Sequence, residues 1–117
     1  VWGTGKVRRE FLYVDDLASA VFFVMGLSKP QIDAIVTPTC SHLNVGSGFD
    51  LTIAELAEAI KAVTSFDGKI EFDQSMPDGT QQKLLDSSRL NNLGWYSSTS
   101  LECGLSEAYS CFLETEV

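Results

Sequence analysis

Positive charge is concentrated at the start of this chain, beside glycines and an aromatic residue. Three of the eight basic residues, Lys6, Arg8 and Arg9, lie within the first nine positions, although the formal net charge is -8. Trp2 precedes them in the same short segment. Such a cluster can bind an anion locally, because an acidic protein needs positive charge only where the ligand lies.

Four side chains could together recognise a phosphorylated ligand. Arg9 offers a planar fork of donors that suits bidentate contact with phosphate, and Lys83 adds a mobile point charge. Trp2 offers a flat apolar face for a sugar or a base. Asp78, in the turn Pro77-Asp78-Gly79-Thr80, could accept hydrogen bonds from hydroxyls or ring N–H groups.

Each of these residues also has an explanation that requires no ligand. Arg9 could form an ion pair with Asp15 or Glu10. The lysine could simply be solvated, the tryptophan could lie in a core, and the aspartate could do no more than shape its turn. Composition alone favours these explanations.

Motifs for several other kinds of site are missing from the sequence. Gly46-Ser47-Gly48 has Leu51 where a dinucleotide fingerprint needs its third glycine, and no Tyr-x-x-x-Lys pair or phosphate-binding P-loop occurs. The single histidine, His42, indicates a structural role, and no spacing of His, Cys, Asp or Glu suits a metal. We therefore expect no catalytic, cofactor-binding or metal-binding residue in this chain.

Composition indicates one soluble domain covering residues 1–117. The chain is 44% hydrophobic and 21% charged, and its 16 acidic residues against 8 basic ones argue against nucleic-acid binding. No apolar run is long enough to span a membrane. Three scattered cysteines, an odd number, indicate reduced thiols and a cytoplasmic location.

Periodicity and capping signals predict short strands alternating with helices. The expected strands cover 11–14, 42–45 and 69–72, with a loop at 31–41 and an irregular polar segment at 73–83. The expected helices run from the Asp15-Asp16 cap to about Leu27, from the Thr52–Glu55 capping box to 63, from Asp86 to Gly94, and over 101–112. The first is apolar nearly all round and should be buried on most sides. This alternation predicts an α/β fold.

Three short strands are too few for a complete doubly wound sheet. The sequence therefore predicts a small mixed α/β lobe that packs against a neighbouring domain. The chain begins with Val1 rather than Met, and its first residues resemble the interior of a domain, which suggests a fragment of a longer protein.

Several motifs resemble a known family. W-G-x-G, R-E-F-L-Y-V-D-D and H-L-N-V-G-x-G resemble the second half of extended short-chain dehydrogenases/reductases that act on nucleotide sugars. The block from Pro77 to Asp86, followed by Arg89-Leu90 and L-G-W-Y, is similar to GDP-L-fucose synthases. The similarity runs from Trp2 to about Leu113, and the later block narrows it to this family.

The resemblance implies an N-terminal Rossmann domain that holds NADP and carries the catalytic residues, none of which lies in this chain. It implies a parent enzyme that epimerises GDP-4-keto-6-deoxy-D-mannose at two carbons and reduces it to GDP-L-fucose. The family's substrate-contacting Trp, Arg and Asp match Trp2, Arg9 and Asp78. Lys83, just before L-L-D, is the further contact that the resemblance suggests.

We therefore expect a C-terminal substrate-binding domain from which the Rossmann half is absent. Its expected partners are a GDP-sugar, its own N-terminal domain and a second copy in a homodimer, with no nucleic acid or membrane. Two alternatives stay open. The chain could be the substrate lobe of another nucleotide-sugar epimerase or dehydratase, or a non-catalytic nucleotide-sugar-binding or interaction module.

Overall fold

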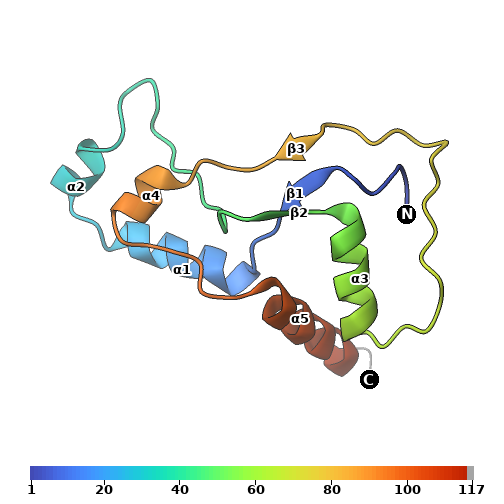
Figure 1. Ribbon diagram of the computed structural model, residues 1–117. Coiled ribbons are helices and arrows are strands. Elements are labelled where there is room, and N and C mark those ends of the chain that lie inside the picture. The colour runs from blue at the N-terminus through green and yellow to red at the C-terminus, as the bar shows by residue number, and fades with distance from the viewer. Residues whose placement is uncertain (116–117) are drawn as a thin grey trace.

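A three-stranded mixed sheet lies at the centre of the computed structural model, which describes residues 1–115 (Figure 1). The strands are β1 (Arg8–Glu10), β2 (Asp50–Thr52) and β3 (Gln82–Lys83), in the order β2-β1-β3. β1 pairs antiparallel with β2 and parallel with β3. The expectation of a small mixed α/β lobe is confirmed.

Helices surround the sheet at its ends. They are α1 (Val14–Met25), α2 (Lys29–Asp33), α3 (Ile53–Val63), α4 (Ser88–Asn92) and α5 (Leu101–Thr115). The expected capping box starts α3, since Thr52 accepts from the Glu55 amide at 3.1 Å and Glu55 accepts from the Thr52 amide at 2.7 Å. The predictions of α3, α4 and α5 are confirmed to within a few residues.

The predicted strand over 11–14 is wrong, because the sheet contains the preceding charged residues 8–10 instead. Arg8 reaches Asp50 on β2, which holds these residues in the ladder. The apolar residues that follow leave the sheet: Leu12 packs against the core and Val14 begins α1.

The predicted strands over 42–45 and 69–72 are also wrong. Leu43 and Val45 are partly buried against the core, but their backbone has no ladder partner among residues 1–115. Around Asp73 the backbone makes only one isolated parallel bridge, with Trp2. Alternating side chains predicted strands here, yet a strand also requires a neighbouring backbone to pair with.

The segment predicted as a loop over 31–41 is partly helical. Pro30 stands in the first turn of α2, and the Ser28 amide donates to Gln31 Oε1 at 2.9 Å at its start. Thr37 and Cys40 then form an isolated antiparallel bridge. Proline is well tolerated at the first turn of a helix, because its missing N–H would have no partner there.

The small core contains Ala20 of α1, Leu90 of α4 and Trp95, all of which are buried. Trp95 Nε1 donates to Ser19 Oγ at 3.0 Å, which satisfies the one polar group of the indole ring. These contacts attach α1 and α4 to each other and leave the sheet outside the core.

The chain exposes far more surface than a folded monomer of its size. Its accessible surface is 8230 Å², whereas a 12.8 kDa monomer exposes about 6300 Å². Its radius of gyration is 17.6 Å, against about 13 Å for a packed chain of this length. The molecule therefore has surface that its own core does not use.

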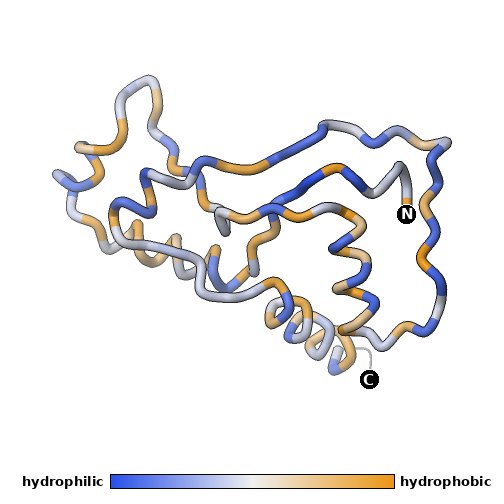
Figure 2. The backbone as a smooth tube through the Cα atoms, in the orientation of Figure 1, coloured by the Kyte–Doolittle hydropathy of each residue, from blue (hydrophilic) through white to orange (hydrophobic). Residues whose placement is uncertain are grey.

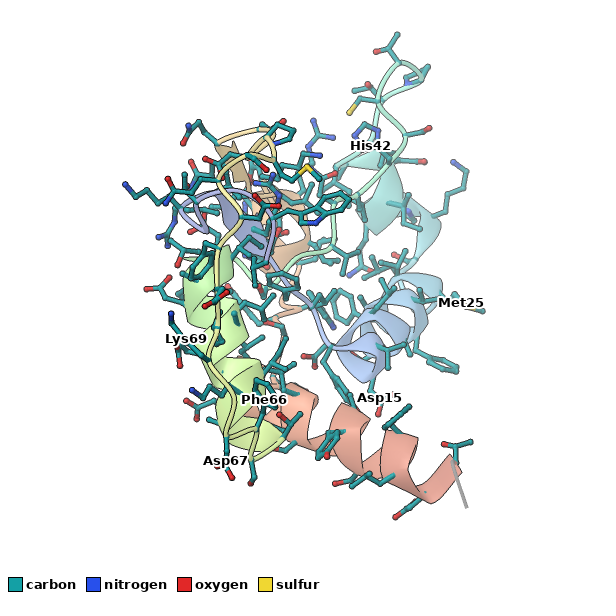
Figure 3. The ribbon with its side chains drawn as sticks, turned by 90° about the vertical axis from the view of Figure 1, so that its right-hand side faces the viewer. Asp15, Met25, His42, Phe66, Asp67 and Lys69 are labelled. Atoms are coloured by element: carbon teal, nitrogen blue, oxygen red, sulfur yellow. The ribbon has the colours of Figure 1, made fainter. Side chains whose placement is uncertain are left out.

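Much of the exposed apolar surface lies on α1, so the prediction that this helix is buried on most sides is wrong. Only Asp16 and Ala20 of α1 are buried, while Phe22 and Met25 are each 76% exposed. Figure 2 shows the apolar character of this helix, and Met25 points away from the rest of the molecule in Figure 3. No helix within residues 1–115 is long and apolar enough to cross a membrane.

Asp16 does not cap α1 as predicted but anchors the segment before α5. The helix begins at Val14, and no side chain caps it. Asp16 is 3% exposed and accepts hydrogen bonds from the Ser98 amide and hydroxyl and from the Thr99 amide, at 3.0 to 3.1 Å. Burial alone would raise the pKa of Asp16, but the Ser98 and Thr99 hydrogen bonds hold it below its usual value.

We predict that Asp16→Asn destabilises the full-length protein by about 1–3 kcal/mol, because the asparagine NH₂ group would face the donors of Ser98 or Thr99 and cannot accept from them. The exposed neighbour Asp15→Asn is the matched control, and it loses only the helix-dipole interaction that both variants lose. Urea unfolding at pH 7 measures the difference.

The difference between wild type and Asp16→Asn should shrink at low pH. Because the folded-state pKa of Asp16 is lowered, its contribution is complete above the unfolded value of about 3.9 and is lost as the pH falls through the folded value. A difference that persists unchanged at pH 2 would contradict this assignment.

Candidate functional site

The parallel pairing of β1 with β3 sorts the basic residues onto two faces. Arg8 is in register with Gln82, and Arg9 is in register with Lys83. Since successive side chains of a strand project to opposite faces, Arg8 and Gln82 share one face while Arg9 and Lys83 share the other. The basic cluster seen in the sequence is thus divided by the sheet.

Asp50 neutralises the first face. Its carboxylate accepts from Arg8 Nε at 2.8 Å and from Gln82 Nε2 at 2.5 Å, so one aspartate bridges β1 and β3 from β2. These bonds, first from Gln82 and then from Arg8, hold the pKa of Asp50 below its usual value. Arg8 therefore has a structural role, because its guanidinium is bound to Asp50.

Arg9 and Lys83 have no such partner. Among residues 1–115, neither lies within 4.0 Å of a carboxylate, so the alternative in which Arg9 pairs with Asp15 or Glu10 is not found. Arg9 Nη1 donates instead to the Arg8 carbonyl at 2.6 Å. Two cations in register on one face repel each other, which leaves this face electrostatically suited to an anion.

Asp78 links the two glycine turns beside this face. Its carboxylate accepts from the Thr4 amide at 2.6 Å and from the Thr4 hydroxyl at 2.8 Å. These two bonds, the amide's first, lower the pKa of Asp78, with a smaller contribution from the charge of Lys6. The carboxylate is ionised and already satisfied in part, while its remaining lone pairs can still accept from a ligand.

The turn that carries Asp78 also passes over Arg9. A Cβ atom placed on Gly79 would lie 3.8 Å from Arg9 Nη2. Trp2, at the other end of the first segment, is 74% exposed while its backbone bridges to Asp73. The four residues predicted from the sequence thus lie on two adjacent segments, 2–9 and 78–83. Thr4 and Asp50 are not among the predicted residues, because their only signal in the sequence is a hydrogen-bonding side chain near a strand or turn.

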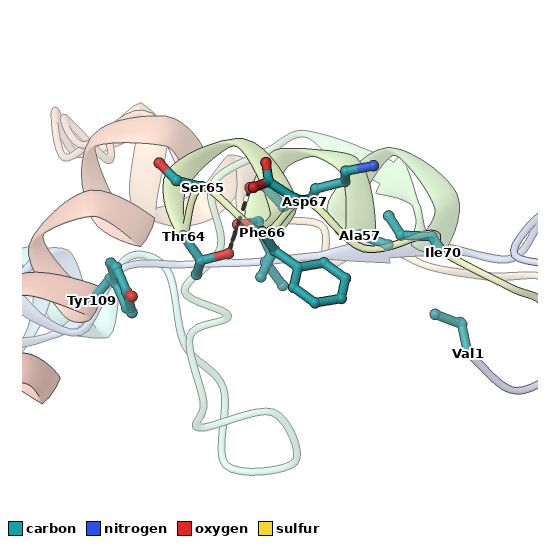
Figure 4. Close-up of a pocket in the computed structure, with 10 residues that line it drawn as sticks. Val1, Ala57, Thr64, Ser65, Phe66, Asp67, Ile70 and Tyr109 are labelled. Atoms are coloured by element: carbon teal, nitrogen blue, oxygen red, sulfur yellow. Dashed lines mark hydrogen bonds between the residues drawn. The ribbon is translucent and has the colours of Figure 1, made fainter.

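Neither of the two cavities described in the chain contains these four residues. One, of about 640 Å³, lies between the end of α3, Phe66 and Tyr109, next to Val1 (Figure 4). The other, of about 780 Å³, is mostly apolar and is lined by segments 11–14, 47–51 and 97–108. The Arg9–Lys83 face therefore lies outside both of these cavities.

The described residues do not fit a dinucleotide. The Gly46–Gly48 loop would have to offer free amides to a pyrophosphate, but the Gly48 amide donates to Glu10 Oε1 at 2.8 Å. A Cβ on Gly46 would lie 2.4 Å from the same oxygen. A carboxylate therefore occupies the place where a phosphate would bind. No group of three or more metal-ligating side chains occurs within residues 1–115 either.

We predict that Gly3→Ala disrupts the Asp78 link. Gly3 has φ of +80°, and a Cβ there would lie 2.3 Å from Asp78 Oδ1. Gly48→Ala is the matched control, because Gly48 has the same φ of +80° with nothing within 4 Å. The left-handed conformation should destabilise both variants by about 1–2 kcal/mol, and Gly3→Ala more. The pKa of Asp78, measured by NMR, should rise in Gly3→Ala only; equal behaviour of both variants would contradict the link.

Comparison with known proteins shows what this chain is similar to. Residues 1–46 match the NAD dependent epimerase/dehydratase family. The chain is 50% identical to a GDP-L-fucose synthase of Escherichia coli over 99% of its own length and 36% of that protein.

Solved structures give the same picture. A GDP-6-OMe-4-keto-L-xylo-heptose reductase from C. jejuni superposes with a TM-score of 0.86 at 34% identity, covering 98% of this chain and 33% of that one. A GDP-L-fucose synthetase from Naegleria fowleri bound to NADP superposes with a TM-score of 0.83 at 26% identity, covering 99% and 34%. This chain thus spans about a third of the length of the relatives it matches. Over that third, from end to end, it is similar to the GDP-L-fucose synthases.

Proposed function

We propose that this chain is the GDP-sugar-binding lobe of an NADP-dependent 3,5-epimerase/4-reductase that converts GDP-4-keto-6-deoxy-D-mannose to GDP-L-fucose. The observation that carries the proposal is the pair Arg9 and Lys83, in register on one face with no carboxylate within 4.0 Å among residues 1–115. A nucleotide diphosphate supplies the two negative charges that this face lacks.

Each remaining residue has a role consistent with such a ligand. The guanidinium of Arg9 would contact the diphosphate in a bidentate manner, and the Lys83 ammonium would add a second charge-assisted bond. Trp2 would offer its exposed indole face to the base or sugar. Asp78, fixed by Thr4, would accept from a hydroxyl or ring N–H group.

In this proposal the rest of the enzyme covers the apolar surface. A Rossmann half outside this chain would hold NADP and the catalytic residues and would dock against α1, whose Phe22 and Met25 are exposed. The surplus of roughly 1900 Å² of surface exceeds the area of about 600–1500 Å² that an inter-domain interface buries. A second copy of the protein could cover what remains.

The identity of the GDP-linked sugar has a second candidate. The similarity to the C. jejuni heptose reductase, at the higher TM-score, favours reduction of a different GDP-linked keto sugar as the alternative. Both candidates share the GDP diphosphate and therefore the same use of Arg9 and Lys83. Assaying the full-length protein with each GDP-keto sugar separates them, and a non-catalytic module would turn over neither.

We predict that Arg9→Ala in the full-length protein weakens GDP-sugar binding about tenfold to a hundredfold, since a charge-assisted hydrogen bond to phosphate contributes about 1.5–3 kcal/mol. Arg9→Lys should recover part of the loss, because the charge remains but the planar fork does not. Calorimetry measures both, with Arg8→Ala, whose residue is bound by Asp50, as the structural comparison. Unchanged affinity of Arg9→Ala would exclude the proposed site.

The isolated 117-residue chain should turn over nothing. Reduction needs a hydride donor held against the ketone and a proton relay, and this sequence has neither a dinucleotide fingerprint nor a Tyr-x-x-x-Lys pair. The assay follows NADPH absorbance with GDP-4-keto-6-deoxy-D-mannose, and deuterium uptake at the epimerised carbons in deuterated water. Either signal above a no-protein control would reveal a catalytic site that we have missed.

A further inference from the structure

Glu10 joins two segments that lie far apart in the sequence. Its Oε1 accepts from the Gly48 amide at 2.8 Å, and its Oε2 accepts from the Leu85 amide at 3.0 Å. Both partners are backbone donors, so both carboxylate oxygens are needed. A glutamine would meet one of the two donors with its own NH₂ group.

A glycine leaves the space that the Glu10 carboxylate occupies. Gly46 is buried, and a Cβ on it would lie 2.4 Å from Glu10 Oε1 and 2.9 Å from Oε2. Any side chain at position 46 would therefore displace the carboxylate. The loop and the glutamate fit each other, which distinguishes this contact from an incidental surface hydrogen bond.

The anion site depends on the position of β3, which is a very short strand. Two residues, Gln82 and Lys83, make too short a strand to fix their own register. Before Lys83, the Arg8 amide donates to the Gln81 carbonyl at 2.8 Å, and Asp50 binds Gln82. After Lys83, Glu10 binds Leu85. The residue next to Arg9 on β1 thus holds the far end of the segment that presents Lys83.

We propose that Glu10 is the positioning residue of the anion site: by binding Gly48 and Leu85 it keeps Lys83 opposite Arg9. This inference rests on the proposed function, because it concerns the affinity of the same site for a nucleotide diphosphate. Glu10 projects to the face opposite Arg9 and acts through backbone placement, without touching the ligand.

The test is Glu10→Gln in the full-length protein, with GDP as the probe. We expect the dissociation constant of GDP, measured by calorimetry, to rise about tenfold, and KM for the GDP-sugar to rise similarly with kcat within about twofold of wild type. Glu55→Gln is the matched control, since Glu55 also accepts from a backbone amide, that of Thr52, at the start of α3. Its GDP affinity should not change.

A second variant keeps the carboxylate but fills the space that it occupies. Gly46→Ala should reproduce the loss of GDP affinity, and it serves in place of Glu10→Gln if that variant fails to fold. In both variants the Leu85 amide should exchange faster with deuterated solvent, which reports directly on the lost contact. Wild-type GDP affinity in Glu10→Gln or in Gly46→Ala would overturn the inference.

A double-mutant comparison separates positioning from general destabilisation. If Glu10 acts through Lys83, then Glu10→Gln should weaken GDP binding less than twofold further when Lys83→Met is already present. Full additivity would contradict the inference. If Arg9→Ala and Lys83→Met both bind GDP normally, the proposed function itself fails, and this inference falls with it.

Discussion

Carboxylate bridges across a very small sheet are the interactions on which the rest of this structure depends. The strands have two or three residues each, so ladder hydrogen bonds alone hold little. Asp50 on β2 binds side chains of both other strands, β1 and β3, and Glu10 binds the backbone of the segments on either side of β1. An acidic chain thus uses its negative charge to place its few cations: it pairs Arg8 with a carboxylate and leaves Arg9 and Lys83 without one among residues 1–115.

A second constraint is the small size of the buried hydrophobic core. The buried cluster of Ala20, Leu90 and Trp95 fastens α1 to α4, and polar bonds from Ser98 and Thr99 to Asp16 hold the segment before α5 against α1. Apolar burial is the main favourable term in folding, and here much of the apolar surface remains exposed. Covering α1 with another apolar surface would remove that area from water and so stabilise the fold.

Local signals predicted the helices well and the strands poorly. The Thr52–Glu55 capping box and the glycine after α4 act within a few residues, so the sequence displays them directly. Strands 42–45 and 69–72 failed because pairing depends on a partner backbone that no local pattern reveals. The candidate site shows the same contrast between local and long-range information. Residue type and resemblance were enough to name its four residues, Arg9, Lys83, Trp2 and Asp78. Their placement, and the roles of Glu10 and Asp50, depend on contacts between residues some 30 to 80 positions apart.

The central claim is that the Arg9–Lys83 face binds a nucleotide diphosphate. The most direct measurement is a crystal structure of the full-length protein with GDP bound. The account predicts phosphate oxygens within hydrogen-bonding distance of the Arg9 guanidinium and of Lys83 Nζ, with Arg8 still bound to Asp50. A diphosphate bound elsewhere, with Arg9 and Lys83 both in contact with solvent only, would contradict it.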